Sequence, residues 1–307
     1  MKLLKVSLCL LLSSLLISGV SFGKAYDVDQ FTILRDINKV IYGVDDRVDY
    51  NSSTAAYKQL ALSTAAQIPN DNLALNGNTY TIKGSNLMNL MDVCSSERFA
   101  KQLAAAQCSG FLVADDVLIT AGHCISTVED CNDHAWVFDY RVASASDGNL
   151  GGSVNIYVPS TSVYRCKEII GHQEGSSVDY AVLRLDRSVT DRPALAYRRT
   201  GTIADNTKVL VIGHPSGLPT KISDGAIVRD STPEGYFITN LDTYGGNSGS
   251  AVFNAQTREV EGILVRGDND YVMAPSGNCF ISNVCPDDGC RGEDVVKITS
   301  VKEINKL

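Results

Sequence analysis

The sequence predicts an all-β protein, built either as a sandwich or as a pair of barrels. Short apolar runs recur from Cys108 onward, and turn residues separate them. The middle of the chain carries no amphipathic helical pattern of ten residues. We expect strands at residues 109–113, 117–120, 135–140, 153–158, 163–170, 180–185, 207–212, 221–229, 235–241, 251–254 and 260–265.

The first two strands and the C-terminal tail carry additional sequence patterns. Residues 109–113 and 117–120 are joined by Ala114-Asp115-Asp116, which predicts a hairpin. In the tail, apolar residues recur on one helical face and two acids precede them, which predicts a C-terminal α-helix. These tail residues are Glu293, Asp294, Val295, Val296, Ile298, Val301 and Ile304.

The overall composition is that of an ordinary globular protein. Of the 307 residues, 44% are hydrophobic and 20% are charged, and the formal net charge is -8. No basic cluster stands out, and an acidic surface repels phosphate backbones. We therefore expect no nucleic-acid partner, and no motif indicates a cofactor.

The N-terminus has the pattern of a secretory signal peptide. Lys2 and Lys5 precede a leucine-rich run that ends near Ile17, and small residues follow as far as Gly23. We assign residues 1–23 to the signal peptide and residues 24–39 to a propeptide or an N-terminal arm. The apolar run is too short for a comfortable membrane span. The sequence therefore predicts a secreted or periplasmic protein without a membrane anchor.

Eight cysteines remain beyond residue 23, and an even number in an exported chain indicates disulfides. A zinc site is the alternative, but no C-x-x-C pair is present, so we expect no metal. Cys124 lies sixteen positions after Cys108 with a hairpin's worth of sequence between them. A bridge between these two would fix the loop that carries His123. Two of Cys279, Cys285 and Cys290 are close enough to form a local loop.

A glycine-rich stretch, residues 242–250, is the first candidate for chemistry. It places Ser248 among small residues between two expected strands. Such a loop exposes a hydroxyl, and its N–H groups can hold an oxyanion. A plain hairpin turn is the alternative. A nucleophilic serine also needs a base, and His123, at the end of the apolar run 117–120, is the best placed of the four histidines.

Three segments together resemble the chymotrypsin-like serine proteases. These are Cys108-Ser109-Gly110-Phe111-Leu112-Val113, Thr120-Ala121-Gly122-His123-Cys124 and Gly246-Asn247-Ser248-Gly249-Ser250. The resemblance covers roughly residues 94–305 and is closest to the bacterial branch that includes glutamyl endopeptidases. It implies two six-stranded antiparallel β-barrels, at roughly 40–190 and 191–307, within a protease domain at 40–307.

The resemblance also implies the roles of the site residues. His123 would be the base and Ser248 the nucleophile, and the family's order along the chain places the acid at Asp179. The N–H groups of Gly246 and Ser248 would form the oxyanion hole. The protein is expected to be a monomer that cleaves proteins or peptides.

Activation would differ from that of animal trypsins, which have aspartate at the position of Asn247. An uncharged Asn247 cannot pair with a new N-terminal amine. Val40-Ile41, followed by Asp45-Asp46-Arg47, resembles the mature start of the bacterial branch. This predicts a zymogen whose propeptide is removed after Lys39.

The resemblance implies a substrate pocket at Asp242, Thr243, Leu264, Arg266 and Gly267. Asp242 would lie at the base of the pocket and favour Lys or Arg in the substrate. Leu264 replaces the pocket histidine of glutamyl endopeptidases. Arg266 either pairs with Asp242 and cancels its charge or receives an acidic side chain. We expect basic substrates over acidic ones.

Two other functions use the same fold or the same triad. A pseudoprotease would bind partners without cutting them, but such chains usually lack a triad residue. An esterase is a further alternative, although the elbow motif of α/β-hydrolases is missing. Asp287, Asp288, Glu293 and Asp294 offer a calcium site, but a solvated disulfide loop is the better interpretation.

Overall fold

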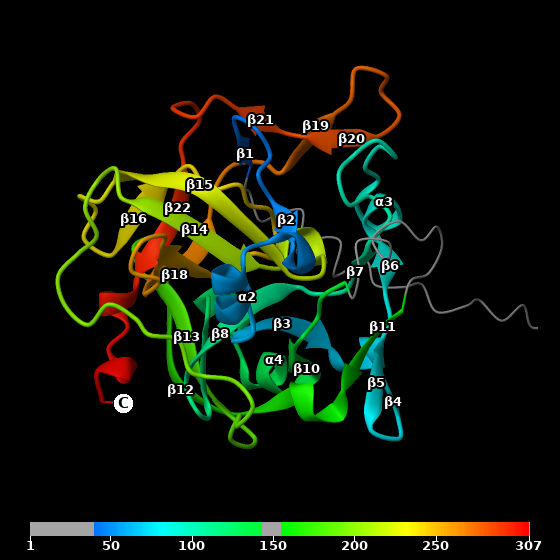
Figure 1. Ribbon diagram of the computed structural model, residues 1–307, viewed down its shortest axis with the longest axis vertical. Helices are drawn as coiled ribbons and strands as arrows, with labels where there is room; N and C mark the ends of the chain where they lie inside the picture. The colour runs from blue at the N-terminus through cyan, green and yellow to red at the C-terminus, as the bar shows by residue number, and fades with distance from the viewer. Residues whose placement is uncertain (1–39, 143–154, 307) are drawn as a thin grey trace, which may run out of the picture.

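The computed structural model describes residues 40–142 and 155–306, and most of them belong to two closed β-barrels that pack side by side (Figure 1). The first barrel has the strand order β10-β12-β13-β9-β8-β3, and each neighbouring pair is antiparallel. Its strands are β3 (Thr64–Pro69), β8 (Cys108–Ala114), β9 (Val117–Thr120), β10 (His134–Phe138), β12 (Val163–Glu174) and β13 (Asp179–Leu185).

The second barrel has the order β14-β17-β18-β22-β16-β15, and pairing between β14 and β15 closes it. Its strands are β14 (Lys208–Gly213), β15 (Lys221–Asp230), β16 (Tyr236–Thr239), β17 (Ala251–Asn254), β18 (Val260–Arg266) and β22 (Glu293–Lys297). A short N-terminal strand, β2 (Val48–Asp49), adds to the edge of β15. The prediction of two six-stranded antiparallel barrels is confirmed.

The expected C-terminal α-helix is not formed, and this part of the prediction is corrected. Residues 293–297 form β22, which pairs with both β16 and β18. Only two 3-10 turns follow, at Ile298–Ser300 and Glu303–Lys306. The β-branched residues Val295 and Val296 suit a strand, and all five residues of β22 are buried, whereas an amphipathic helix would bury one stripe. The barrel needs this sixth strand in order to close.

The other expected strands lie close to the observed ones. Residues 117–120 and 251–254 have the expected bounds, and 109–113 gains one residue at each end. The apolar stretch at 60–68 contains the end of a helix, α2 (Ala55–Ala61), and then β3. The expected signal peptide at 1–23 and the propeptide at 24–39 lie outside the described residues.

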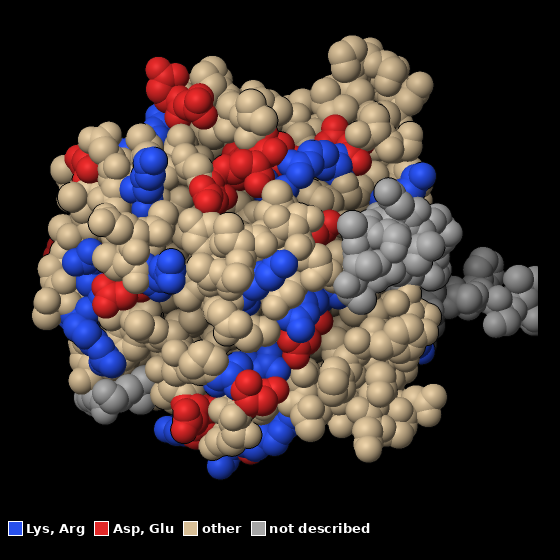
Figure 2. Space-filling model, in the orientation of Figure 1, with Lys and Arg blue, Asp and Glu red and all other residues tan. Residues whose placement is uncertain are grey.

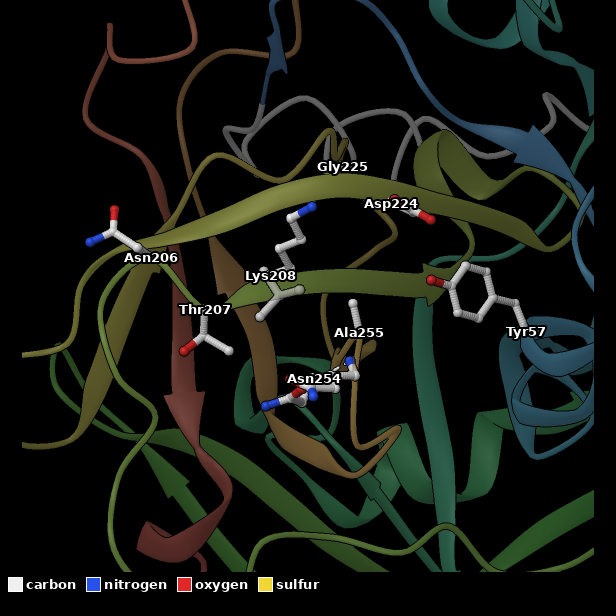
Figure 3. Close-up of a pocket in the computed structure, with 10 residues that line it drawn as sticks. Tyr57, Asn206, Thr207, Lys208, Asp224, Gly225, Asn254 and Ala255 are labelled. Atoms are coloured by element: carbon white, nitrogen blue, oxygen red, sulfur yellow. Dashed lines mark hydrogen bonds between the residues drawn. The ribbon is translucent and has the colours of Figure 1, made fainter.

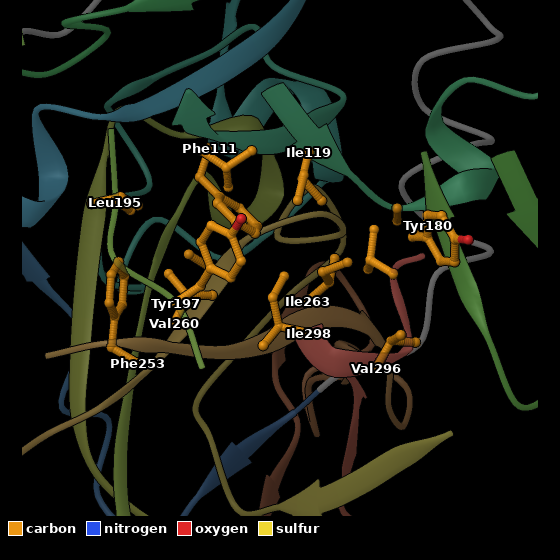
Figure 4. Packing of buried hydrophobic residues seen from close by; sticks show 14 of the residues in the cluster. Phe111, Ile119, Tyr180, Leu195, Tyr197, Phe253, Val260, Ile263, Val296 and Ile298 are labelled. Carbon is orange, nitrogen blue, oxygen red and sulfur yellow. The ribbon is translucent and has the colours of Figure 1, made fainter. Parts of the chain in front are cut away.

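Apolar side chains fill each barrel and the space between the two. Leu112, Trp136 and Leu183 lie in a cluster within the first barrel, and Val252 and Val295 in a cluster within the second. A third cluster takes residues from both barrels and joins them (Figure 4). It includes Phe111, Ile119, Tyr180, Phe253, Ile263 and Val296. This interface holds the strand ends of the two barrels in a fixed relation.

Short elements cover the outside of the barrels. The helices besides α2 are α3 (Leu87–Met91) and α4 (Val128–Asp133), and in the described part of the chain none is long and apolar enough to cross a membrane. Small two- and three-stranded sheets complete the fold. Their strands are β1 (Ile41–Tyr42), β4 (Leu73–Asn76), β5 (Thr79–Ile82), β6 (Ser85–Asn86), β7 (Leu103–Ala104), β11 (Ile156–Pro159), β19 (Tyr271–Met273), β20 (Phe280–Ser282) and β21 (Val284–Cys285).

Four disulfides cross-link the described residues: Cys94–Cys279, Cys108–Cys124, Cys131–Cys166 and Cys285–Cys290. The bridge between Cys108 and Cys124 is present, and two of the three late cysteines form the expected local loop. Four disulfides are typical of a protein that folds in an oxidising compartment outside the cytosol. Acidic and basic side chains lie in small mixed groups on the face shown in Figure 2.

Candidate active site

His123 lies on a short turn directly after β9. The turn is the 3-10 segment Gly122–Cys124, and the Cys108–Cys124 disulfide ties it to the first residue of β8. A Cβ at Gly122 would overlap the carbonyl oxygen of Gln173, so only glycine lets the turn approach β12 this closely. The His172 side chain of β12 is also within hydrogen-bond distance of the Gly122 carbonyl, at 3.1 Å. The loop is therefore held from two sides.

Asp179 is the first residue of β13, and its carboxylate faces the His123 loop. One oxygen lies 2.8 Å from Nδ1 of His123, and the other accepts from the His123 backbone N–H at 3.1 Å. Burial by itself would raise the pKa of Asp179. The two hydrogen bonds and the charges of His123 and Arg266 outweigh burial and hold the pKa of this carboxyl below its usual value. Asp179 is thus an ionised acceptor that orients the imidazole.

Ser248 is carried by the glycine-rich loop between β16 and β17, and this loop packs on the His123 loop. The Ser248 carbonyl accepts from the Ser109 N–H at 2.8 Å and lies 3.8 Å from Sγ of Cys124. A Cβ at Gly249, whose φ is +85°, would overlap the Thr120 hydroxyl. The loop can therefore reach β9 only with glycine at this position.

The three candidate side chains are not yet linked into one hydrogen-bonded chain. The Ser248 hydroxyl lies 3.5 Å from the Val265 carbonyl oxygen. Nε2 of His123 has no hydrogen-bond partner in the described part of the chain. Catalytic hydrogen bonds are often long in the free enzyme and tighten when substrate binds.

The predicted oxyanion hole depends on the peptide between Gly245 and Gly246. The Gly245 carbonyl accepts from the Ser216 N–H at 2.5 Å. Because the N–H and C=O of a trans peptide point in opposite directions, the Gly246 N–H is directed away from Ser216. Gly246 has a φ of +90°, and a Cβ there would meet the His214 carbonyl, so glycine is required for this orientation as well.

Both carboxylate oxygens of Asp242, the expected base of the pocket, are engaged by the N-terminal segment. Its two carboxylate oxygens accept from the backbone N–H groups of Tyr42 at 2.7 Å and Asp46 at 3.0 Å. Burial, together with the negative charges of Asp46 and Asp45, raises the pKa of Asp242 to about 7, against the effect of the two hydrogen bonds. This geometry assigns Asp242 to holding the N-terminal segment rather than to receiving a substrate.

Arg266 and Leu264, both expected in the substrate pocket, have contacts that the sequence did not predict. The Arg266 guanidinium donates to the carbonyls of Gly175 and Ser176 and lies 3.5 Å from Asp179, so it neither cancels Asp242 nor lies next to it. Leu264 is fully buried in the apolar cluster of the second barrel. Sequence reasoning missed the contact of Arg266 with Asp179.

Glu293 is the functional candidate that sequence reasoning missed. It was expected to begin a helix, but it lies in β22, where it is fully buried and accepts from the Thr243 hydroxyl at 2.6 Å. Thr243 and Gly267, both predicted pocket residues, lie on either side of its carboxylate. The available signal was an acid followed by the β-branched pair Val295 and Val296, which suits a barrel strand as well as a helix.

A metal site does not fit these residues. Cys108, His123 and Cys124 offer ligand atoms within 4.8 Å of one another. However, the two sulfurs are joined in a disulfide and are not thiolates, and Nδ1 of His123 is engaged by Asp179. These three residues therefore do not form a metal site, and Nε2 of His123 is the atom suited to proton transfer.

A separate hollow of about 690 Å³ lies on the second barrel and does not include the candidate triad (Figure 3). Tyr57 of α2, Lys208 at the start of β14, Asp224 of β15 and Asn254 of β17 line it. No nucleophile with a neighbouring base lines this hollow, so it offers no alternative catalytic centre among the described residues.

Comparison with known proteins gives the family of the chain. Residues 108–263 match the family described as "Trypsin-like peptidase domain". An "Extracellular metalloprotease" of Bacillus subtilis (strain 168) is 28% identical over 152 residues, which cover 48% of this chain and 45% of the relative. The chain thus spans less than half the length of that relative.

Two solved structures are also similar. One is a Glu endopeptidase in complex with MPD, with 17% identity, a TM-score of 0.46 and coverage of 87% of this chain and 98% of the other. The second is the Vibrio cholerae VesB protease, with 13% identity, a TM-score of 0.49 and coverage of 85% and 66%.

Proposed function

Because the chain belongs to the trypsin-like peptidase family, we propose that it is an exported serine endopeptidase with His123, Asp179 and Ser248 as its catalytic triad. One observation carries this proposal: Nδ1 of His123 lies 2.8 Å from the Asp179 carboxylate, on a loop packed against the Ser248 loop. This is the pair that a nucleophilic serine needs, namely a base and the acid that orients it.

The reaction follows from these positions. Ser248 Oγ attacks the scissile carbonyl while Nε2 of His123 takes the hydroxyl proton. The C–N bond then breaks, the leaving amine receives that proton, and an acyl-enzyme forms on Ser248. Water then attacks the ester carbonyl while Nε2 of His123 takes its proton. The bond between the acyl carbon and Ser248 Oγ breaks, Oγ receives that proton, and the acid product leaves. Asp179 fixes Nδ1–H and stabilises the imidazolium in both halves.

The backbone around Ser248 stabilises the tetrahedral intermediates. The N–H groups of Gly246 and Ser248 donate to the oxyanion, and each such donor contributes about 3 kcal/mol in related enzymes. Gly246 and Gly249 have positive φ values, which lets the loop curl around the reacting carbon.

A fluorophosphonate probe tests the assignment. Ser248 of the purified protein should be labelled, and Ser248→Ala should lose both labelling and peptidase activity by a factor on the order of 10⁴ or more. Ser276→Ala, at an exposed serine, serves as the matched control and should behave as wild type. Substantial peptidase activity in Ser248→Ala would contradict the proposal.

A pseudoprotease is the second candidate, because the Ser248 hydroxyl lies near the Val265 carbonyl and Nε2 of His123 has no partner among the described residues. Such a protein would bind partners without cutting them. The same probe decides between the two, since a silent site leaves Ser248 unlabelled.

Export and maturation belong to the same proposal. Residues 1–23 act as the signal peptide and residues 24–39 as a propeptide, so that the protease domain spans 40–307. N-terminal sequencing of the exported protein should then begin at Val40. A start at Lys24 or Tyr26 would agree with removal of the signal peptide but would contradict the removal of a propeptide.

A further inference from the structure

Glu293 is the acidic residue at the start of β22, on the strand face whose apolar side chains fill the second barrel. Side chains alternate along β22, so Glu293 lies on the same face as Val295, which packs in the apolar interior. Glu293 has no exposed surface. Burying a carboxylate costs free energy, so an acid at the end of an apolar row indicates a function beyond packing.

The two chain segments that lie next to Ser248 enclose this carboxylate. On one side, the Thr243 hydroxyl donates to Oε2 at 2.6 Å, and Thr243 belongs to the loop that leads to Ser248. On the other side, a Cβ at Gly267 would overlap the Glu293 carboxylate. Gly267 lies two residues after Val265, and the Val265 carbonyl is 3.5 Å from the Ser248 hydroxyl.

The nearby charged groups have contacts of their own. Asp242 accepts from the backbone of the N-terminal segment, and Arg266 contacts Asp179 and the carbonyls of residues 175 and 176. Arg291 lies 2.7 Å from Asp294, and its charge also acts on Glu293. Asp270 accepts from the Gly245 N–H at 2.8 Å, whereas Glu293 is the carboxylate in contact with both Thr243 and Gly267.

Tyr42 supports this position of the charge. Burial raises the pKa of the Tyr42 hydroxyl, and the negative charge of Glu293 raises it further. The ring of Tyr42 thus lies near the Glu293 charge. Its backbone N–H donates to Asp242, the carboxylate that was expected to bind substrate.

We propose that Glu293, rather than Asp242, determines substrate specificity, and that it selects a Lys or Arg side chain immediately before the scissile bond. This inference rests on the proposed protease function. A cationic side chain that enters between Thr243 and Gly267 forms a charge-assisted hydrogen bond with a carboxylate that the Thr243 hydroxyl already orients. An acidic side chain at the same place is repelled by Glu293.

The test uses the purified mature protein and four fluorogenic peptides that differ only in the residue before the scissile bond: Lys, Arg, Gln or Glu. Wild type should cleave the Lys and Arg peptides about 100-fold faster in kcat/KM than the Gln peptide, as expected for a desolvated ion pair. Glu293→Gln should lose about 100-fold on Lys and stay within a few-fold of wild type on Gln. Asp268→Asn, which removes a partly exposed carboxylate beside Gly267, is the control and should change the Lys rate less than about threefold.

A second measurement needs no variant and so does not depend on folding of Glu293→Gln. Benzamidinium should inhibit wild type competitively against the Lys peptide, and neutral benzamide should not. Fluorophosphonate labelling separates the two proposals. An unlabelled wild type would contradict the protease itself. A labelled wild type that prefers Glu, ignores benzamidinium, or retains its Lys preference in Glu293→Gln would overturn the role of Glu293.

Discussion

The two barrels contribute to the site in different ways. The first barrel supplies His123 and Asp179 from the ends of neighbouring strands, β9 and β13, which pair along their length. The second supplies Ser248 from a loop, whose start is held by backbone contacts of the N-terminal segment with Asp242 and Thr243. The proposed base and its acid are therefore fixed by one sheet, whereas the proposed nucleophile depends on segments far apart in the sequence.

Under the two proposals, this difference separates the residues of the chemical step from the residue that selects the substrate. The His123–Asp179 pair depends on the β9–β13 register, on the Cys108–Cys124 disulfide and on the approach of the Gly122 turn to β12. Glu293 reaches its position only because β22 closes the second barrel between β16 and β18. Changes in the first barrel should therefore affect the chemical step, and changes around β22 should affect the choice of substrate.

The largest effect should follow from Asp179→Asn. The amide would donate to Nδ1 and place the proton of the neutral imidazole on Nε2, where it cannot accept from Ser248. We expect kcat to fall by about 10⁴-fold with little change in the melting temperature. Active-site-titrated kinetics measure the first quantity and calorimetry the second.

Asp186→Asn is the matched control, since Asp186 directly follows β13 at the end opposite Asp179 and contacts Arg187 at the surface. It should change kcat less than about twofold. An Asp179→Asn enzyme that kept a tenth of wild-type kcat would show that another group orients His123.

A smaller effect is expected when either of two disulfides is removed, one in the first barrel and one in the loop before β22. The two variants should differ in their free energy of unfolding. Cys108–Cys124 spans 16 residues and Cys285–Cys290 spans 5. Loop closure predicts a loss of about 3 kcal/mol in the free energy of unfolding for the double Cys→Ala variant of the first pair and about 2 kcal/mol for the second. Denaturant unfolding in a Ser248→Ala background, which prevents self-digestion, measures both.

The two disulfide variants should differ more in kcat than in the free energy of unfolding. The first pair holds the His123 turn, so its removal should lower kcat, and the second lies in the loop before β22 and should leave kcat unchanged. Equal losses of kcat would mean that the disulfide does not position His123.

The sequence could single out the residues of the proposed triad because each lies in a contiguous motif at the end of an apolar strand. His123 follows residues 117–120, Asp179 precedes 180–185, and Ser248 lies among glycines whose positive φ values the loop requires. The short apolar runs locate most of the strands, and the resemblance of the three motifs to a known family implied the two barrels and the choice of Asp179.

The proposed role of Glu293 in specificity could not be predicted in the same way. Val295 and Val296 satisfy helical and strand periodicity equally, and only pairing with β16 and β18 decides between them. The role of Asp242 depends on backbone N–H groups of Tyr42 and Asp46, far away in the sequence. Hydrogen bonds between distant segments leave no local pattern.

The smallest effect concerns the N-terminal segment that Asp242 holds. Because folding raises the pKa of Asp242 to about 7, the folded state favours its protonated form. The stabilisation is complete below the unfolded pKa of about 4 and is lost as the pH rises through 7. Asp46→Asn removes a like charge near Asp242, so it should lower the pKa of Asp242 and make the fall in stability between pH 5 and 8 shallower by about 1 kcal/mol.

Denaturant unfolding of the Ser248→Ala protein with and without Asp46→Asn measures this slope. Asp268→Asn serves as the control, because its partly exposed carboxylate is not among the charges that raise the pKa of Asp242. If Asp46→Asn and its parent lose stability at the same rate as the pH rises, the Asp46 charge does not act on Asp242. The preference for Lys over Gln peptides is measured separately, in an Asp46→Asn variant that keeps Ser248. A shallower slope together with an unchanged preference would show that Asp242 holds the N-terminal segment and that Glu293 selects the substrate.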